Sequence, residues 1–120
     1  VSESIHIAIV VGEASGDILG AALMQEFRKI YPQASFSGIG GPRMLEQGFH
    51  SFFPQDRLAV MGLIEPLKRL FELLRIRKFL REHFIKNPPN VFIGIDSPDF
   101  NLSLEEALKV KGIKTVHYVS

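Results

Sequence analysis

The stretch that most constrains how this chain folds is residues 7–20, which read IAIVVGEASGDILG. Its first five residues are a continuous apolar run rich in β-branched side chains, typical of a strand covered on both faces in a parallel sheet. Gly12 can adopt backbone angles that other residues avoid, while Gly16 and Gly20 would allow a helix to pack closely on the strand. The stretch therefore predicts a buried strand, a tight turn and a helix, with ligands bound just past the carboxyl end of the strand.

The residues of this turn limit the kinds of ligand that it could bind. The glycines are spaced G-x-x-x-G-x-x-x-G, which is neither the dinucleotide fingerprint nor a Walker phosphate loop. Glu13 and Asp17 would repel a pyrophosphate, although the amides of a helix N-terminus alone would attract one. Carboxylates in this position suit hydroxyl or amine donors, such as those of a sugar. The alternative is an acidic helix start that Ser15 or Asp17 caps.

Strands and helices are predicted to alternate along the rest of the chain. The first helix covers residues 15–30 and ends at Tyr31, because the residue before a proline is pushed out of the helical conformation. Apolar and alternating runs predict strands at 35–39, 49–53, 91–95 and 114–119, and helical spacing with glycine or proline boundaries predicts helices at 44–48, 63–85 and 103–110. This alternation predicts an α/β fold with a doubly wound parallel sheet.

Composition limits the function classes. The 120 residues form one domain or part of one, and a net charge of +1 gives no overall field that would attract nucleic acid. The absence of cysteine excludes disulfides and cysteine metal sites. No apolar run reaches the ~20 residues of a membrane span, and the first residues lack a signal peptide, so we expect a cytosolic protein. Residues 115–120 have the pattern of a core strand with nothing after it, so we also expect the natural chain to continue.

The histidines and serines give no familiar catalytic or metal arrangement. The four histidines show no metal-ligand spacing, and Ser15 does not lie in the G-x-S-x-G elbow of a serine hydrolase. His83 is expected in solvent. His117, near the carboxyl end of the last predicted strand, is the histidine of most functional interest.

Two further turns contain candidate catalytic or binding residues. Asp96 directly follows the apolar strand at 91–95, so its carboxylate is expected at the carboxyl end of that strand, where a general base could act. The alternative role for Asp96 is turn formation or helix capping, which Asp99 can also provide. Residues 40–43, GGPR, offer backbone amides and the Arg43 guanidinium at a helix start. That arrangement is either an anion site or a tight turn with a solvated arginine.

The helix expected over residues 63–85 carries more apolar surface than one stripe facing a sheet needs, and it is basic. Such a helix can lie on an anionic membrane or contact an acyl chain. The alternative is a plain crossover helix whose long basic side chains reach into water. The residues that would make the membrane or acyl contact are Ile64, Leu67, Leu70, Phe71, Leu74, Arg69 and Arg75.

Five segments spread along the whole chain resemble the lipid-A-disaccharide synthases, a family of bacterial glycosyltransferases. They are residues 12–17 (GEASGD), 40–44 (GGPRM), 59–62 (AVMG), 94–101 (GIDSPDFN) and 112–120 (GIKTVHYVS). The resemblance implies a glycosyltransferase-B fold, in which two Rossmann-like halves enclose the active site in a cleft. Residues 1–120 would be the first part of the N-terminal, acceptor-side half. The C-terminal domain that binds the nucleotide sugar would be absent, and the fragment alone would be inactive.

The resemblance also implies a reaction and its partners. UDP-2,3-diacylglucosamine would be joined to 2,3-diacylglucosamine 1-phosphate, with inversion, to give the lipid A disaccharide 1-phosphate and UDP at the cytoplasmic face of the inner membrane. No cofactor, metal or nucleic acid is implied, and the full-length protein could be a homodimer. Asp96 matches the general base; the substrate-binding residues would be Gly12, Glu13, Ser15, Gly16, Asp17, Gly41, Arg43, Met61 and Gly62. Two alternatives remain at this stage: an epimerase-like enzyme acting on another nucleotide sugar, and a flavodoxin-like binding module without catalysis.

Overall fold

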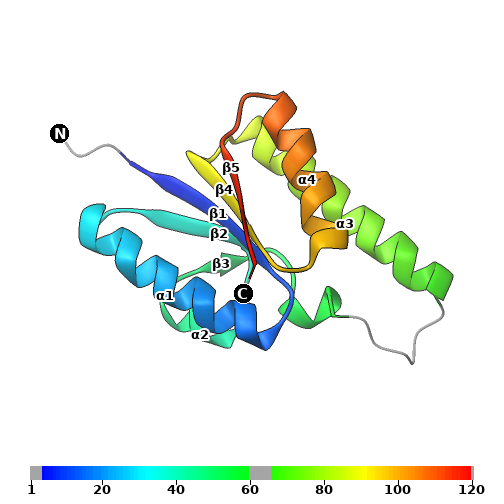
Figure 1. The fold of residues 1–120 in the computed structure, drawn as a ribbon, viewed down its shortest axis with the longest axis horizontal. Helices are drawn as coiled ribbons and strands as arrows, with labels where there is room; N and C mark the ends of the chain where they lie inside the picture. The colour runs from blue at the N-terminus through cyan, green and yellow to red at the C-terminus, as the bar shows by residue number, and fades with distance from the viewer. Residues whose placement is uncertain (1–3, 60–65, 120) are drawn as a thin grey trace.

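A computed structural model describes residues 4–59 and 66–119 of the chain. Its elements, in order, are β1 (His6–Val11), α1 (Ala14–Ile30), β2 (Ser35–Ile39), α2 (Pro42–Glu46), β3 (His50–Ser51), the 3-10 turn η1 (Gln55–Arg57), α3 (Pro66–Lys86), β4 (Val91–Ile95), α4 (Pro98–Val110) and β5 (Thr115–Tyr118). The strands form one parallel sheet in the order β3-β2-β1-β4-β5 (Figure 1). The predicted α/β fold with a doubly wound parallel sheet is confirmed.

Strand β1 lies at the centre of the sheet and is buried on both of its faces. Ile7, Ile9 and Val11 pack on one side in a cluster with residues of α1 and α2, such as Met24 and Met44. The alternate residues of β1 pack on the other side against α3 and α4, which cover the opposite face (Figure 1). Burial on both faces explains why β1 is apolar from Ile7 to Val11 instead of alternating with polar residues. Strand β1 therefore contributes side chains to both core clusters, as its neighbours β2 and β4 also do.

Several predicted boundaries are wrong, for local reasons. Strand β3 has only two residues instead of five predicted at 49–53. Helix α4 begins at Pro98 instead of residue 103, because proline suits the first helical turn and the preceding Ser97 has a left-handed conformation that ends the strand segment. Helix α1 begins after Glu13 and has no side-chain cap, so the expected capping by Ser15 or Asp17 does not occur. Gly20 gives room to Met44 of α2 rather than to a strand.

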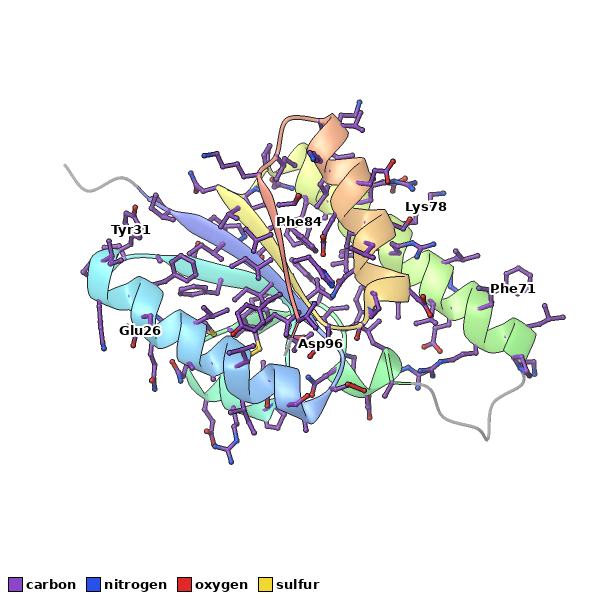
Figure 2. All side chains as sticks on the ribbon, viewed as in Figure 1. Glu26, Tyr31, Phe71, Lys78, Phe84 and Asp96 are labelled. Carbon is purple, nitrogen blue, oxygen red and sulfur yellow. The ribbon has the colours of Figure 1, made fainter. Side chains whose placement is uncertain are left out.

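Helix α3 presents two apolar stripes, and only one of them packs on the sheet. Ile76, Leu80 and Phe84 are almost completely buried in the core. The second stripe, which we call the α3 stripe, consists of Leu67, Leu70, Phe71 and Leu74, whose exposed fractions range from 41% to 64%. Figure 2 shows the contrast, with Phe84 between the helix and the sheet and Phe71 on the end of α3 that projects past the sheet.

Two residues that the sequence assigns to a membrane contact, Arg69 and Ile64, are not part of the α3 stripe. Arg69 is only 6% exposed, and its Nε and Nη2 atoms have no hydrogen-bond partner among the residues that the structure describes. Arg69 therefore does not belong to the α3 stripe, and its assignment to an exposed contact surface is wrong. Ile64 lies outside the described residues. No described helix is long and apolar enough to cross a membrane.

The two stripes of α3 predict opposite responses to mutation. Phe84→Ala should lower the free energy of unfolding by about 3–5 kcal/mol, because it leaves a cavity in a packed core. Phe71→Ala, on the same helix, should change it by less than about 0.5 kcal/mol, because its ring is exposed. Urea unfolding followed by circular dichroism would measure both. Equal losses for the two variants would contradict this assignment of the buried and exposed stripes.

Candidate functional site

The loops after β1 and β4 meet at the carboxyl edge of the sheet. These two strands are neighbours, and the chain leaves them toward opposite faces, so their carboxyl ends mark the topological switch point of the sheet. A Cβ atom on Gly12 would lie 2.7 Å from Ser97 Oγ and 3.2 Å from Leu58 Cβ. Gly12 does not have a positive φ. The glycine is therefore required for space between the two loops, and the expectation of unusual backbone angles at Gly12 is wrong.

Asp96 lies at this switch point in an unusual backbone conformation. Its φ is 52° and that of Ser97 is 43°, so two consecutive residues with side chains have left-handed conformations. Such conformations cost free energy and persist where surrounding contacts hold them, which occurs most often at functional sites. The Asp96 N–H donates to the Tyr118 carbonyl at 2.8 Å. The Asp96 residue is partly buried at the end of β4, as its label in Figure 2 marks.

A buried amide holds this strained turn. Asn101 is fully buried, and its Nδ2 donates to the carbonyl of Asp96 at 3.0 Å and to that of Val10 at 3.2 Å. A longer contact of 3.5 Å reaches the Ile95 carbonyl. Asn101 thus ties the end of β1 to the end of β4. No local pattern marks Asn101 for this role, because its acceptors are backbone carbonyls and one of them lies 91 residues away along the chain.

Asp17 caps the neighbouring helix α2. Its carboxylate accepts hydrogen bonds from the backbone N–H groups of Gly41 at 3.1 Å and of Arg43 and Met44 at 3.0 Å each. The carboxylate is buried, with 3% of the residue exposed. The backbone amides that the sequence offers as an anion site are therefore already occupied by Asp17. The side chain of Asp17 positions the turn before α2 instead of lining a cleft, while Arg43 is exposed.

Glu13 and Ser15 are exposed polar residues in the segment that follows β1. Glu13 precedes α1, and its carbonyl accepts a hydrogen bond from Gln55 Nε2 at 2.9 Å. Gln55 therefore fastens the loop after β3 to the loop after β1, a contact that nothing in the sequence signals. Gly16 is buried, and a Cβ atom there would lie 3.2 Å from Val11 Cβ, so it allows α1 to pack on the sheet as predicted. Met61 and Gly62 lie outside the described residues.

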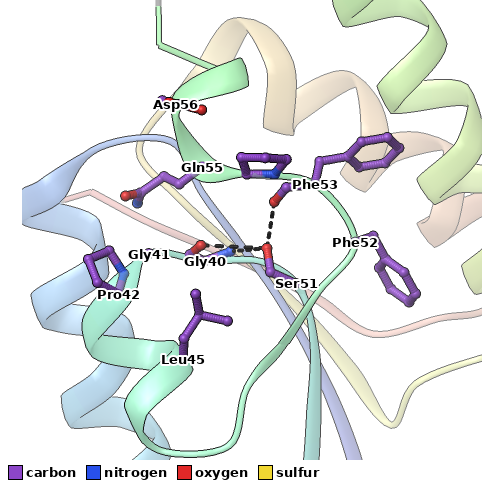
Figure 3. Close-up of a pocket in the computed structure, with 10 residues that line it drawn as sticks. Gly40, Gly41, Pro42, Leu45, Ser51, Phe52, Phe53, Gln55 and Asp56 are labelled. Atoms are coloured by element: carbon purple, nitrogen blue, oxygen red, sulfur yellow. Dashed lines mark hydrogen bonds between the residues drawn. The ribbon is translucent and has the colours of Figure 1, made fainter.

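A pocket of about 500 Å³ opens beside these loops (Figure 3). Its apolar wall comes from Pro42, Leu45, Phe52, Phe53 and Pro54, and its polar rim from the two glycines after β2, Ser51, Gln55 and Asp56. Ser51 Oγ donates to the Phe53 carbonyl at 2.6 Å and accepts from the Gly40 N–H at 3.1 Å, which shapes one side of the pocket (Figure 3). The pocket extends the carboxyl edge from β1 towards β3 with a surface that is mostly apolar.

His117 is paired instead of being available at the edge. Its Nδ1 lies 2.7 Å from Glu105 Oε2, and both side chains are largely buried. Burial raises the pKa of the Glu105 carboxyl above its usual range, while the hydrogen bond and the charge of His117 act in the opposite direction. His117 and Glu105 thus attach β5 to α4. Within the ranges 4–59 and 66–119, no group of three or more histidine, cysteine or acidic side chains is placed to hold a metal ion.

The parallel sheet, its helices on both faces and the polar turns gathered at its switch point define a Rossmann-like α/β domain. Residues 7–120 match the model of a protein family described as lipid-A-disaccharide synthetase, and the chain belongs to that family. This membership argues against both the epimerase-like enzyme and the flavodoxin-like module.

Curated relatives agree with this family. The chain is 82% identical over 119 residues to a lipid-A-disaccharide synthase of Cellvibrio japonicus, covering 99% of this chain and 31% of the relative. It is 65% identical over 115 residues to that of Saccharophagus degradans, with 96% and 30% covered. It is 59% identical over 116 residues to that of Hahella chejuensis, with 97% and 29% covered. The chain therefore spans about 30% of the length of the curated relatives it matches.

The capping role of Asp17 can be tested by its effect on stability. Asp17→Ala should lower the free energy of unfolding by about 2–4 kcal/mol, because three backbone N–H groups, two of them in buried hydrogen bonds, lose their acceptor. Asp17→Asn should lose less, since one side-chain oxygen remains, and the exposed control Glu13→Gln should change stability by under about 0.5 kcal/mol. The measurement is the shift of the urea midpoint. An Asp17→Ala protein of unchanged stability would refute the cap.

Proposed function

We propose that the whole protein carrying this chain is a hexosyltransferase of lipid A biosynthesis that makes the lipid A disaccharide. Family membership supports the reaction class, since residues 7–120 match the family model. The single structural observation that carries the proposal is Asp96, a carboxylate at the switch point of a parallel sheet, in a left-handed turn held by Asn101. The residues described here would form part of the acceptor side of the active-site cleft.

Asp96 is proposed as the general base of a single displacement. It would remove the proton from the 6-hydroxyl of 2,3-diacylglucosamine 1-phosphate while that oxygen attacks the anomeric carbon of UDP-2,3-diacylglucosamine. The bond from that carbon to the diphosphate breaks in the same step, UDP leaves with the electron pair, and the configuration inverts. A carboxylate in hydrogen-bond reach of the hydroxyl is suited to this role.

The exposed polar groups beside Asp96 are proposed to bind the acceptor sugar. Glu13 and Ser15, at the N-terminus of α1, can exchange hydrogen bonds with the hydroxyl groups of the sugar. Gly12 and Gly41 would act indirectly, because they give room to Ser97 and to Asp17 in the loops that hold these residues. The exposed guanidinium of Arg43 would pair with the acceptor phosphate, because arginine matches phosphate oxygens with two parallel N–H groups. In this proposal Asp17 and Gly16 support the cleft by packing and do not touch the sugar.

Asp96→Asn in the full-length protein should lower kcat by at least ~100-fold, because the amide cannot accept the hydroxyl proton. Its KM should change little, since the variant keeps the shape of the residue. Asp99→Asn is the matched control: Asp99 is an exposed acidic residue in the first turn of α4, and its replacement should leave kcat unchanged. A radiolabelled-donor assay measures both. Near-normal turnover of Asp96→Asn would remove Asp96 as the base.

We further propose that the α3 stripe rests on the cytoplasmic face of the inner membrane. Leu67, Leu70, Phe71 and Leu74 follow one another at three- and four-residue spacing, so they share one side of the helix. Arg75 and Lys78 are exposed on the same helix, and cations near an apolar stripe favour anionic lipid surfaces. Substrates with acyl chains reside in the membrane, so such contact would bring the active site to them. The protein would thus be cytoplasmic and peripherally bound.

Replacing all four residues of the α3 stripe with serine should shift the full-length protein from sedimented vesicles to the supernatant, because the apolar contact is lost. The control replaces four exposed apolar residues elsewhere, Ile18, Ile30, Leu102 and Val110, with serine. This control should sediment as the wild type does. Unchanged sedimentation of the α3 variant, with its circular dichroism spectrum intact, would show that α3 is only a crossover helix.

A further inference from the structure

A second pocket lies at the opposite, amino-terminal edge of the sheet. It has a volume of about 650 Å³ and receives side chains from four elements. We call it the histidine pocket, and its polar members are His6, Ser35, Ser37, His50, His83, Lys86 and Asn87. Because β1 runs from His6 to Val11, about 16 Å of strand separates this pocket from the carboxyl edge. The pocket is therefore distinct from the site proposed for glycosyl transfer.

His6 is held in the wall of the pocket by two serine hydroxyls. Its Nδ1 lies 2.8 Å from Ser35 Oγ, and its Nε2 lies 2.7 Å from Ser37 Oγ. Ser35 Oγ also donates a weak bond to the Ile5 carbonyl, which leaves it as the acceptor of an Nδ1–H. Ser37 then donates to Nε2 while His6 is neutral. Protonation of His6 would make Nε2 a donor, and the Ser37 hydroxyl hydrogen would be released for another acceptor.

His50, His83 and Lys86 provide donors that the protein itself does not use. Among the described residues, no hydrogen bond or ion pair involves their side-chain nitrogens. The ring of Phe52 lies between the two imidazoles, with centroid distances of 4.8 Å to His50 and 4.6 Å to His83. His83 also stacks on Phe79 at 5.9 Å with an angle of 11° between the rings. These contacts pack both imidazoles against aromatic rings, while His83 remains partly exposed to solvent.

The ionisable groups that line the histidine pocket are all basic. Its described lining contains three imidazoles and one ammonium group and no carboxylate. Three other cavities on the described surface differ, because each includes at least one acidic residue: Asp56 in one, Glu72 in another, and Glu105 with Glu106 in the third. Burial, and secondarily the charge of His83, lower the pKa of His6 below its ordinary value. An anion seated here would oppose both effects and favour the protonated imidazoles.

We propose that the histidine pocket binds a phosphate group and takes up a proton as it does so. A phosphate presents several strong acceptor oxygens and up to two negative charges, which match imidazole, ammonium and hydroxyl donors arriving from β1, β2, β3 and α3. The titratable groups that face the site are His6, His50, His83 and Lys86. The binding does not depend on glycosyl transfer, so its test is independent of the proposal for Asp96.

The test follows the histidine side chains of the full-length protein by NMR during titration with inorganic phosphate, against chloride at equal ionic strength. Phosphate should raise the pKa of His6 and shift the side-chain signals of His83, and binding should be tighter at about pH 6 than at about pH 8. A parallel titration uses sulfate, whose charge does not change between about pH 6 and about pH 8. A pH dependence that sulfate also shows must come from a proton taken up by the protein and not by the ligand. Sulfate should show the same preference for low pH.

Matched lysine variants on one helix test the location. Lys86→Gln should weaken phosphate binding by about tenfold, because one charge-assisted hydrogen bond is lost, whereas exposed Lys78→Gln should leave it unchanged. Both residues are on the surface, so neither change should unfold the protein. Equal affinities of Lys86→Gln and the wild type would overturn the proposal and indicate an adventitious ion only. The absence of a histidine shift at either pH, with inorganic phosphate and with vesicles containing phosphatidic acid alike, would also overturn it.

A parallel titration with vesicles containing phosphatidic acid distinguishes a soluble phosphate ligand from a lipid head group. Shifts of His6 and His83 with inorganic phosphate support a soluble phosphate ligand. Shifts that appear only with the vesicles, and disappear in Lys86→Gln, support a lipid head group. Both results uphold a phosphate site in the histidine pocket. Shifts that persist with vesicles of neutral lipid would overturn it, because no phosphate monoester is then present.

Discussion

The buried Asn101 amide is the contact on which the carboxyl edge depends. It donates to carbonyls at the ends of both β1 and β4, so it joins the two strands where their loops diverge to opposite faces. Without it, the left-handed conformations of Asp96 and Ser97 would have to be held by weaker contacts. Asp17 acts in the same way between α1 and the turn before α2. Two buried polar side chains thus fix the backbone of the edge, and the exposed Glu13 and Ser15 remain available to a ligand.

Much of this architecture could be predicted from sequence because it depends on local patterns. The apolar runs at residues 7–11 and 91–95 predicted strands buried on both faces, and both are buried in the sheet. The position of Asp96 past the end of its strand followed from the same runs, since a parallel strand exposes its carboxyl end at one edge. The excess apolar surface of α3 was also visible, and it resolves into one buried and one exposed stripe.

What could not be predicted depends on partners distant in sequence. Asp17 was interpreted as a ligand or a cap of its own helix, and its three donors lie 24 to 27 residues away. Gln55 contacts the carbonyl of Glu13, 42 residues away, through one side-chain amide that no spacing rule marks. Arg69 is charged and was therefore expected at the surface, but it lies seven residues before Ile76, on the buried side of α3. In each case the tertiary fold decides which of two locally reasonable roles the side chain takes.

The absence of a side chain at Gly94 lets helix α4 pack closely against β4, beside the last strand β5. A Cβ atom on Gly94 would collide with the Glu105 carboxylate and would lie 3.0 Å from Asn101 Cβ, so α4 can approach β4 only because that residue has no side chain. Glu105 in turn holds His117 of β5, which pairs with Gly94 in the sheet register. Asn101 and Glu105 are four residues apart, so they lie on the same side of α4. A side chain at position 94 would displace both at once, and the Asp96 turn and the attachment of β5 would change together.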